Sequence, residues 1–149
     1  MPFTPPTTVT SQANAGYLST FLIGSPPAAI AEVKSFTLDL ISMPEIPTTT
    51  LLSPSNTEEF VPGMIKPGKV QISGNFIGDT TQLQFTTLAQ AQTIFTFIVK
   101  APVQRNTKTA TWTMNGFVCG YKPGPFENNK AIEFSAEIQL TGAYTEVVT

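Results

Sequence analysis

The sequence contains no histidine and only one cysteine, Cys119, among its 149 residues. Without histidine, the chain lacks the usual general base near neutral pH, the partner in Ser-His and Cys-His catalytic pairs, and the commonest metal ligand. A single cysteine excludes an internal disulfide and cannot build a zinc site. We therefore expect no enzyme activity, no metal and no cofactor, and we expect the function to reside in the surfaces of the protein.

Charged residues are also scarce. They make up 12% of the sequence, about half of the usual quarter, and the net charge is −2. No cluster of Lys and Arg is present, so the basic stripe of a nucleic-acid-binding protein is missing. No apolar run approaches the roughly 18 residues of a membrane-spanning helix, so no membrane insertion is expected. The N-terminal segment lacks the basic and apolar regions of a signal peptide, which argues against secretion.

Threonine is abundant instead, with 23 residues, and it suits the pleated surface of a β-sheet. Stretches of alternating apolar and polar residues, bounded by Gly or Pro, predict six strands. These strands cover residues 16–24, 29–41, 69–78, 93–101, 110–121 and 130–142. Over residues 79–93 the spacing of apolar residues changes from every second residue to that of a helix, and this segment predicts one helix. It begins with a loose capping box formed by Asp79 and Gln82. Its inner face carries Phe85, Leu88 and Ala91.

This order predicts a mainly β (α+β) fold, an antiparallel β-sandwich or half-barrel with one short helix. Residues 1–15 are rich in Pro, Thr and Ser and predict a flexible N-terminal arm. Residues 16–146 form the domain, and 147–149 form a short C-terminal tail. The segment 42–68 contains five prolines, and a structureless loop of this length is improbable in a compact domain. We therefore predict a projecting hairpin there, with its turn at residues 53–56.

Three predicted strands have a polar face of small or acidic side chains. Its members are Ser35, Thr37, Asp39, Gln71, Ser73, Asn75, Glu133, Ser135, Glu137 and Gln139. They include three acids and no base, so the joined faces would form a weakly acidic surface that repels a polyanion. Lys34 occurs among the apolar positions of its strand, and we expect it to reach solvent near the strand end. On the last strand, Ile132, Phe134, Ile138 and Leu140 are expected in the core.

Two other strands, at 93–101 and 110–121, carry apolar residues on both faces and are expected to be buried against another subunit. In the second of them, alternation places Phe117, Cys119 and Tyr121 on the face opposite Trp112, Met114 and Val118. The paired carboxylates Glu133 and Glu137 lie about 13 Å apart along a strand. This exceeds both glycosidase separations and argues further against an enzyme.

The order of these segments resembles the tail tube (major tail) proteins of long-tailed bacteriophages over about residues 16–146. The matching parts are AEVKSFTLDL with the Pro/Thr segment after it, FVPGMIKPGKVQISGNF, GDTTQLQFTTLAQAQTIFTFIV, WTMNGFVCGYKPG and NNKAIEFSAEIQLTG. The resemblance implies hexameric rings that stack into a hollow tube around a tape-measure protein, with tail-end proteins as further partners. It also implies that the subunit sheets join into an inner β-barrel with an electronegative lumen. Double-stranded DNA would pass through this lumen without specific binding.

The resemblance places the protein in the virion tail, after assembly in the host cytoplasm. The ten residues of the polar face would then face the lumen. The long loop and the terminal arms would make ring-to-ring contacts. In the loop these contacts are expected from Ile46, Thr49, Leu51, Leu52, Glu58, Glu59 and Phe60. The chain departs from some members of the family because it lacks a C-terminal immunoglobulin-like domain and has few acids in the loop.

Two alternatives remain open at this point. One is a carbohydrate- or receptor-binding β-sandwich module, in which Trp112 would stack on a sugar. Trp112 is flanked by threonines on a strand that looks buried, which favours a role in the core. The other is the inner-tube protein of a contractile injection machine, which shares the architecture of the tail tube.

Overall fold

The structure is a computed structural model. It describes residues 18–24, 26–52, 54 and 57–149, and the predicted arm at 1–15 lies outside these residues. The helix is α1 (Thr80–Ala91). The strands, in chain order, are β1 (Thr20–Ile23), β2 (Ala28–Ala29), β3 (Val33–Leu38), β4 (Ile41–Ser42), β5 (Glu45–Pro47), β6 (Phe60–Pro62), β7 (Lys66–Pro67), β8 (Lys69–Asn75), β9 (Phe95–Val103), β10 (Lys108–Pro123), β11 (Glu133–Leu140) and β12 (Thr145–Val148).

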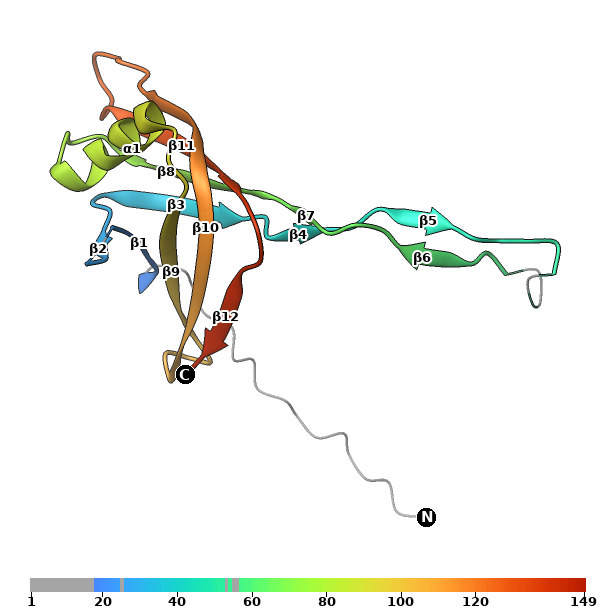
Figure 1. The fold of residues 1–149 in the computed structure, drawn as a ribbon. Helices are drawn as coiled ribbons and strands as arrows, with labels where there is room; N and C mark the ends of the chain where they lie inside the picture. The colour runs from blue at the N-terminus through green and yellow to red at the C-terminus, as the bar shows by residue number, and fades with distance from the viewer. Residues whose placement is uncertain (1–17, 25, 53, 55–56) are drawn as a thin grey trace.

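The main sheet contains eight strands, all paired antiparallel, in the order β2-β1-β9-β10-β11-β8-β3, with β12 also paired to β10. The longest strand, β10, pairs with β9 along one edge, and with β12 and then β11 along the other. Figure 1 shows β9 and β10 running side by side, with β3 and β8 crossing them. The prediction of a mainly β fold with antiparallel strands and one helix is therefore confirmed.

The sheet curls so that strands from its two ends meet. The Phe21 ring of β1 lies 6.4 Å from the Phe36 ring of β3 and stacks at 5.1 Å on Phe97 of β9. The curled sheet is a half-barrel filled by its own apolar side chains. The buried apolar residues are Phe21, Ile23, Ile30, Val70, Ile72, Phe85, Phe97, Val99, Met114, Val118, Phe134, Ala136, Ile138 and Leu140.

Helix α1 covers one end of this half-barrel (Figure 1). The Asp79 carboxylate accepts a hydrogen bond from the Thr80 N–H at 2.7 Å and caps the helix N-terminus. The helix ends at Gln92, which adopts a left-handed conformation with φ 52°. The Phe85 side chain is fully buried and anchors the helix to the sheet. The amphipathic pattern in the sequence therefore identified this helix and its core-facing ring, but Ala91, predicted on the same face, is exposed at the helix end.

Gln82 is the buried polar residue of the described chain, and all of its hydrogen bonds are satisfied internally. Its Oε1 accepts from the N–H groups of Ile77 and Gly78, at 3.0 and 3.2 Å. Its Nε2 donates to the carbonyls of Ala31 and Asn75, at 2.9 and 2.8 Å. The predicted capping box is therefore wrong in one contact, because the Gln82 side chain bonds backbone groups of the loop that precedes Asp79. In this way Gln82 ties α1 to β8 and to the connection before β3.

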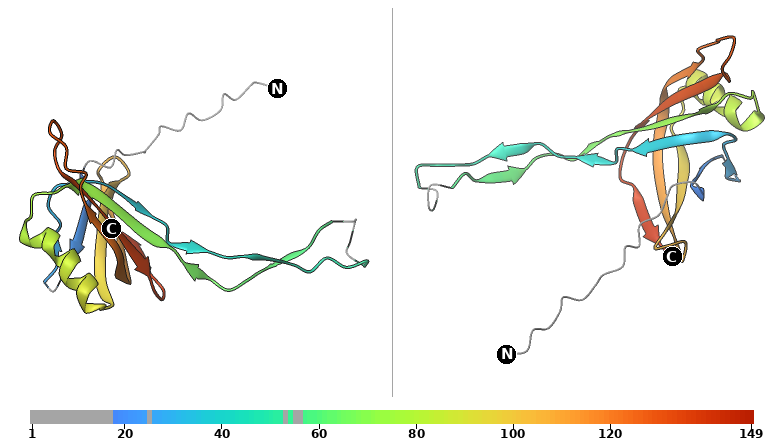
Figure 2. Two further views of the ribbon diagram at one scale, coloured as in Figure 1. Left: turned by 90° about the horizontal axis from the view of Figure 1, so that it is seen from above. Right: turned by 180° about the vertical axis from the view of Figure 1, so that it is seen from behind.

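A long two-stranded arm projects from the sheet between β3 and β8 (Figures 1 and 2). At its root β4 pairs with β7, and farther out β5 pairs with β6, where Ile46 lies opposite Val61. Beyond that, the Thr48 N–H donates to the Glu59 carbonyl at 2.8 Å. We call residues 41–67 the hairpin arm. Residues 53, 55 and 56 of the predicted turn lie outside the described residues.

Two irregularities change which face a side chain occupies. The strand predicted over 29–41 is divided at Glu32, whose φ is 58°, and a register shift follows between Val33 and Ser35. This shift turns Lys34 to the same side of the sheet as Ser35. The prediction that Lys34 occupies an apolar position of its strand is therefore wrong. The division leaves β2 and β3 as separate strands on opposite ends of the sheet order.

The second irregularity is a bulge in β10 between Val118 and Gly120. Because the bulge adds one residue, alternation reverses beyond it. Phe117 and Cys119 lie on the face opposite Met114 and Val118, as expected, but Tyr121 packs into the core against Phe85. The prediction that Tyr121 shares the outer face with Phe117 and Cys119 is therefore wrong.

The ends of the last strands also differ from expectation. Ile132 is 37% exposed rather than buried, because β11 begins only at Glu133. At the C-terminus, β12 pairs with β10, and Thr109 and Thr149 exchange backbone hydrogen bonds of 2.9 and 3.0 Å. The expected domain boundary at 146 therefore falls within a strand, and the following residues continue the sheet instead of forming a separate tail.

Candidate functional site

The strands β3, β8 and β11 are neighbours in the sheet, and this places the ten predicted polar residues on one outward face. All ten are exposed or half-buried, while the residues between them on β8 and β11 point into the core. We call this surface the polar face. It consists of Ser35, Thr37, Asp39, Gln71, Ser73, Asn75, Glu133, Ser135, Glu137 and Gln139.

The register aligns like side chains in rows across the polar face. Ser73 lies opposite Ser35 on one side and Ser135 on the other, and the Oγ atoms of Ser35 and Ser73 are 2.7 Å apart. In the next row, Gln71 lies between Thr37 and Glu137. The rows line an open hollow, to which hydroxyl side chains, Gln71, Glu137 and Lys122 contribute. No aromatic side chain is among the residues that line it.

The expectation that this surface carries no base is wrong. The bulge in β3 brings Lys34 onto it, and Lys69 belongs to it by simple alternation with Gln71. Lys122 joins them because the bulge in β10 puts it in register with Ser135. Three ammonium groups thus accompany three carboxylates, those of Asp39, Glu133 and Glu137. The charges of the ten polar-face residues and these three lysines balance, and the Glu32 carboxylate, which accepts from the Asn75 Nδ2 at 3.2 Å, adds a fourth acid at the border of the face.

One of these lysines pairs closely with an acid. The Lys34 Nζ donates to the Glu133 Oε1 at 2.8 Å, across the intervening strand β8, and both side chains are 52% exposed. The hydrogen bond and the charge of Lys34 lower the pKa of Glu133, and Lys130 contributes less. Exposed ion pairs of this kind contribute little to the stability of the fold. The pair therefore matters mainly for the charge that this surface presents.

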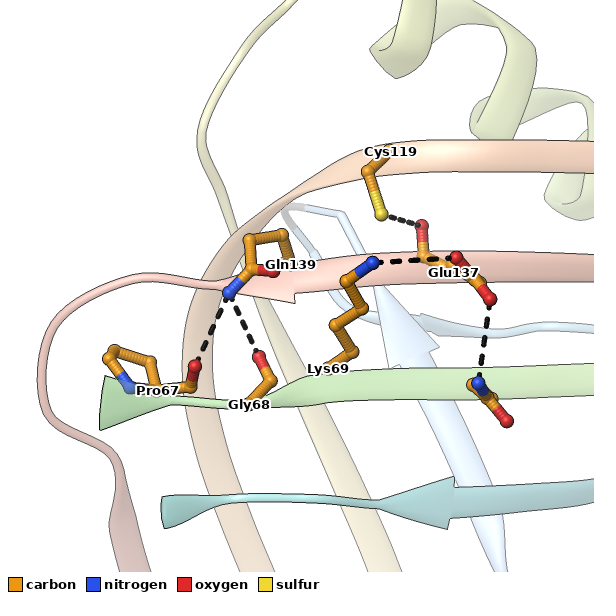
Figure 3. Close-up of polar contacts among 7 residues, drawn as sticks. Pro67, Gly68, Lys69, Cys119, Glu137 and Gln139 are labelled. Atoms are coloured by element: carbon orange, nitrogen blue, oxygen red, sulfur yellow. Dashed lines mark hydrogen bonds and ion pairs between the residues drawn. The ribbon is translucent and has the colours of Figure 1, made fainter. Parts of the chain in front are cut away.

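Glu137 lies on β11, between β8 and β10, and contacts residues of both strands (Figure 3). Its Oε2 lies 3.9 Å from the Lys69 Nζ, and its Oε1 accepts from the Gln71 Nε2 at 3.4 Å. Its main-chain carbonyl accepts a weak hydrogen bond from the Cys119 thiol at 3.5 Å. The carboxylate is therefore held between an amide and an ammonium group of the neighbouring strand.

Gln139 connects the polar face to the root of the hairpin arm (Figure 3). Its Nε2 donates to the carbonyls of Pro67 and Gly68, at 3.4 and 3.1 Å. A Cβ atom at Gly68 would collide with the carbonyl oxygen of Asp39, so only glycine lets β3 and β8 approach so closely here. The arm is thus fixed to the polar face at its base.

The seven loop residues predicted to make contacts all lie on the hairpin arm and are exposed. Leu51 and Leu52, near its tip, are 105% and 92% exposed. Other large apolar side chains are exposed along the arm. They are Ile41, Met43, Ile46, Phe60, Val61, Met64 and Ile65. Exposed apolar side chains in such number are typical of interaction sites, and the predicted contacts of the arm stay a prediction.

Two strand edges border the polar face. On one side β3 pairs only with β8 in the described chain. On the other side the pairing of β10 with β9 ends at Gly116, so residues 117–123 pair only with β11. Unpaired strand edges are ready templates for pairing with another chain.

The described residues hold no group of acids, Cys and His that could bind a metal ion. Among them there is also no helix of the length and apolarity that crossing a membrane requires. The outer side of β9 carries Thr96 and Lys100, which are exposed, and Ile98, which is half-buried. The expected burial of this strand against another subunit stays a prediction.

The sequence matches no protein-family model and no curated protein. Solved structures do match. A chain of the tail of the empty gene transfer agent particle, solved with C6 symmetry, superposes with a TM-score of 0.73 at 11% identity, over 91% of this chain and 99% of that chain. A chain of the SPP1 tail tube superposes with a TM-score of 0.60 at 12% identity, over 88% of this chain and 76% of that chain.

A contractile system matches as well. A chain of the sheath-tube complex of the PVC extracellular contractile injection system gives a TM-score of 0.66 at 14% identity, over 89% of this chain and 88% of that chain. These likenesses span 88–91% of this chain. The protein therefore has the fold of the tail tube proteins found in phage tails and related injection systems.

Proposed function

We propose that this protein is a structural subunit that self-assembles into stacked hexameric rings and so forms the hollow tube of a virion tail. The observation that carries the proposal is a polar surface bordered by two unpaired strand edges, with an apolar arm projecting beside it. The shared fold supports it, because one matching chain comes from a tail with C6 symmetry. A structural role also agrees with a chain that has no histidine.

In the proposed ring, the edge of β3 in one copy pairs with residues 117–123 of β10 in the next. Six repeats close an inner barrel and satisfy the backbone groups of both edges. The polar face then lines the lumen. Its side chains carry hydroxyl, amide or carboxylate groups, and two of its three lysines are paired with carboxylates, so the wall is close to charge balance. Such a wall offers few phosphate contacts, which allows double-stranded DNA to pass without specific binding.

The hairpin arm provides the proposed contact between rings. Its apolar side chains would be buried against the adjacent ring, and the N-terminal arm would add to this contact. Because the arm of one copy meets a different surface on another, the contact is heterologous and rings can stack without limit. A tape-measure protein inside the tube and tail-end proteins at its ends would then set its length. Assembly would take place in the host cytoplasm.

A second candidate is the inner tube of a contractile injection machine. The likeness to a chain of a sheath-tube complex favours it, because the same fold serves there. The two candidates differ in what the outer surface meets, since only a contractile tube is enclosed by a sheath. A carbohydrate-binding module is disfavoured. Trp112 is half-buried and packs against the core, and so it offers no exposed platform.

Negative-stain electron microscopy of concentrated protein tests the proposal. Wild-type protein should form rings and tubes about six subunits around. Replacing Leu51 and Leu52 together by serine should leave rings but abolish stacking, while Leu83→Ser on the exposed side of α1 is the matched control. A protein that stays monomeric at all concentrations, even with a tail-initiating complex present, would contradict the proposed function.

A further inference from the structure

Lysines on the polar face are an unexpected feature for a surface proposed to let DNA slide past. Each uncompensated lysine that contacts a phosphate releases counterions and adds affinity for DNA. Such contacts would be repeated in every subunit along a tube. Two of these lysines, Lys34 and Lys69, come from different strands and both end beside a carboxylate of β11.

Both pairs use a carboxylate of β11, but they differ in closeness. Lys34 and Glu133 are 99 residues apart in the sequence, yet their charged atoms are 2.8 Å apart. Lys69 and Glu137 are joined at 3.9 Å, and Gln71 donates to the other carboxylate oxygen. Both acids lie on β11 with Ser135 between them, so each carboxylate compensates one lysine.

Stability does not account for these pairs. The side chains of all four members are between 45% and 52% exposed, and ion pairs this open to solvent add little to folding. The face also carries nearly as many lysines as acids, so its net charge alone gives little repulsion of a polyanion. What the pairs change is the availability of the lysines, because an ammonium group already bonded to a carboxylate gains less from a phosphate.

We propose that Glu133 and Glu137 mask Lys34 and Lys69, and that this masking keeps the wall from binding double-stranded DNA. The inference rests on the proposed function, since it assumes that DNA meets this face. It differs from simple repulsion in one respect. Under masking, only the carboxylates beside the lysines matter, whereas repulsion depends on the total negative charge of the protein.

The test is a fluorescence anisotropy titration of a labelled 20-base-pair DNA duplex with dispersed protein, over a range of salt concentrations. The masking variant is Glu133→Gln with Glu137→Gln, which removes two charges and keeps the side-chain shape. The matched control is Glu45→Gln with Glu58→Gln, which removes the same charge from the hairpin arm. Melting curves verify that each variant folds. Lys122 is present in every variant, so it does not affect the comparison.

Wild-type protein and the control should bind the duplex equally weakly. The DNA affinity of the masking variant should be about tenfold higher at 50 mM salt than at 200 mM salt, in excess of any salt dependence in the control. The reason is that two phosphate contacts give a slope of about −1.8 in a plot of log affinity against log salt concentration. Adding Lys34→Gln and Lys69→Gln to it should return the wild-type affinity. Equal binding by the masking variant and the control, or tight binding by wild-type protein, would overturn the inference.

These outcomes separate the inference from the proposed function. If the wild-type protein forms tubes but the masking variant gains no DNA affinity, masking is wrong and the tube stands. If the protein never forms rings, the proposed function is wrong whatever the titration gives. Ring formation by the masking variant, followed by microscopy, shows whether the two acids also serve assembly.

Discussion

The ring of Phe85 stacks on the ring of Tyr121 with centroids 5.9 Å apart, and this contact joins α1 to the end of β10. Phe134 lies 6.1 Å from the first ring and 6.3 Å from the second, so the three form one aromatic cluster beneath the helix. Tyr121 reaches this cluster only because of the bulge before it. A local irregularity in one strand thus provides the anchor for the helix that covers the half-barrel.

Replacing Phe85 by alanine should lower the free energy of unfolding by about 3–5 kcal/mol, because it empties the centre of this cluster. Leu83→Ala, on the same helix but 47% exposed, should change it by less than about 0.5 kcal/mol. Guanidinium denaturation followed by the fluorescence of the single tryptophan measures both. Equal losses in the two variants would show that the helix does not depend on this ring.

Tyr121→Phe should leave stability unchanged or raise it slightly, by up to about 1 kcal/mol. Its hydroxyl is buried with no hydrogen-bond partner within the described residues, and burial raises the pKa of Tyr121. Removing an unsatisfied hydroxyl while keeping the ring relieves a desolvation cost. The same denaturation series measures the change. A clear loss of stability would reveal a partner for the hydroxyl, such as a bound water.

The pKa of Glu133 should rise when Lys34 is replaced by glutamine. In the folded wild type, Lys34 lowers this pKa below its usual value, so the pair stabilises the fold above the pKa of the unfolded chain. That contribution is lost as the pH falls through the lowered pKa of the folded state. A carboxyl-detected NMR titration of both proteins gives the two midpoints. Identical midpoints would mean that the ion pair does not persist in solution.

Gly68→Ala should destabilise the protein by about 1–3 kcal/mol, because the new methyl group would push β3 away from β8. Gly120→Ala is the matched control on the same sheet. A Cβ there would meet the Glu137 Cβ at 3.8 Å, an ordinary contact, so little change is expected. Thermal melting compares the two. If both substitutions are tolerated, the close approach at the root of the hairpin arm is not required.

Asp39→Lys and Lys122→Glu should each reduce tube formation, and combining them should restore it. The two residues lie on the strands that border the polar face, and neither forms an ion pair within the described residues. In the proposed ring they come from adjacent copies. Lys122 shares a row with Ser35, so a stagger of four residues at the seam would place Lys122 opposite Asp39. Sedimentation measures the yield of tubes. No rescue in the combined variant would exclude this pairing.

The sequence was a good guide where alternation is regular. The faces of β8 and β11 follow the pattern of their side chains, and the helix follows its apolar spacing. Even Lys69 could have been assigned to the polar face, because it continues the alternation of Gln71 and Ser73. The tail tube likeness also agrees with the fold that the solved structures share.

Prediction failed where the backbone departs from that regularity. A bulge has no reliable sequence signal, and each of the two bulges moved a residue to the opposite face, Lys34 in one case and Tyr121 in the other. The pairing of Lys34 with Glu133 joins positions 99 residues apart, which alternation within single strands cannot reveal. The charge balance of the polar face therefore emerged only from the assembled sheet.

The hairpin arm has a mechanical consequence. Its two sides continue directly into β3 and β8, so a pull on the tip draws both strands in the same direction along their length. The resisting element is then the ladder between β8 and β11, whose seven registered pairs would be loaded together in shear. Because the hydrogen bonds of a ladder loaded this way must break together and not one after another, the arm can bear tension without peeling the sheet apart.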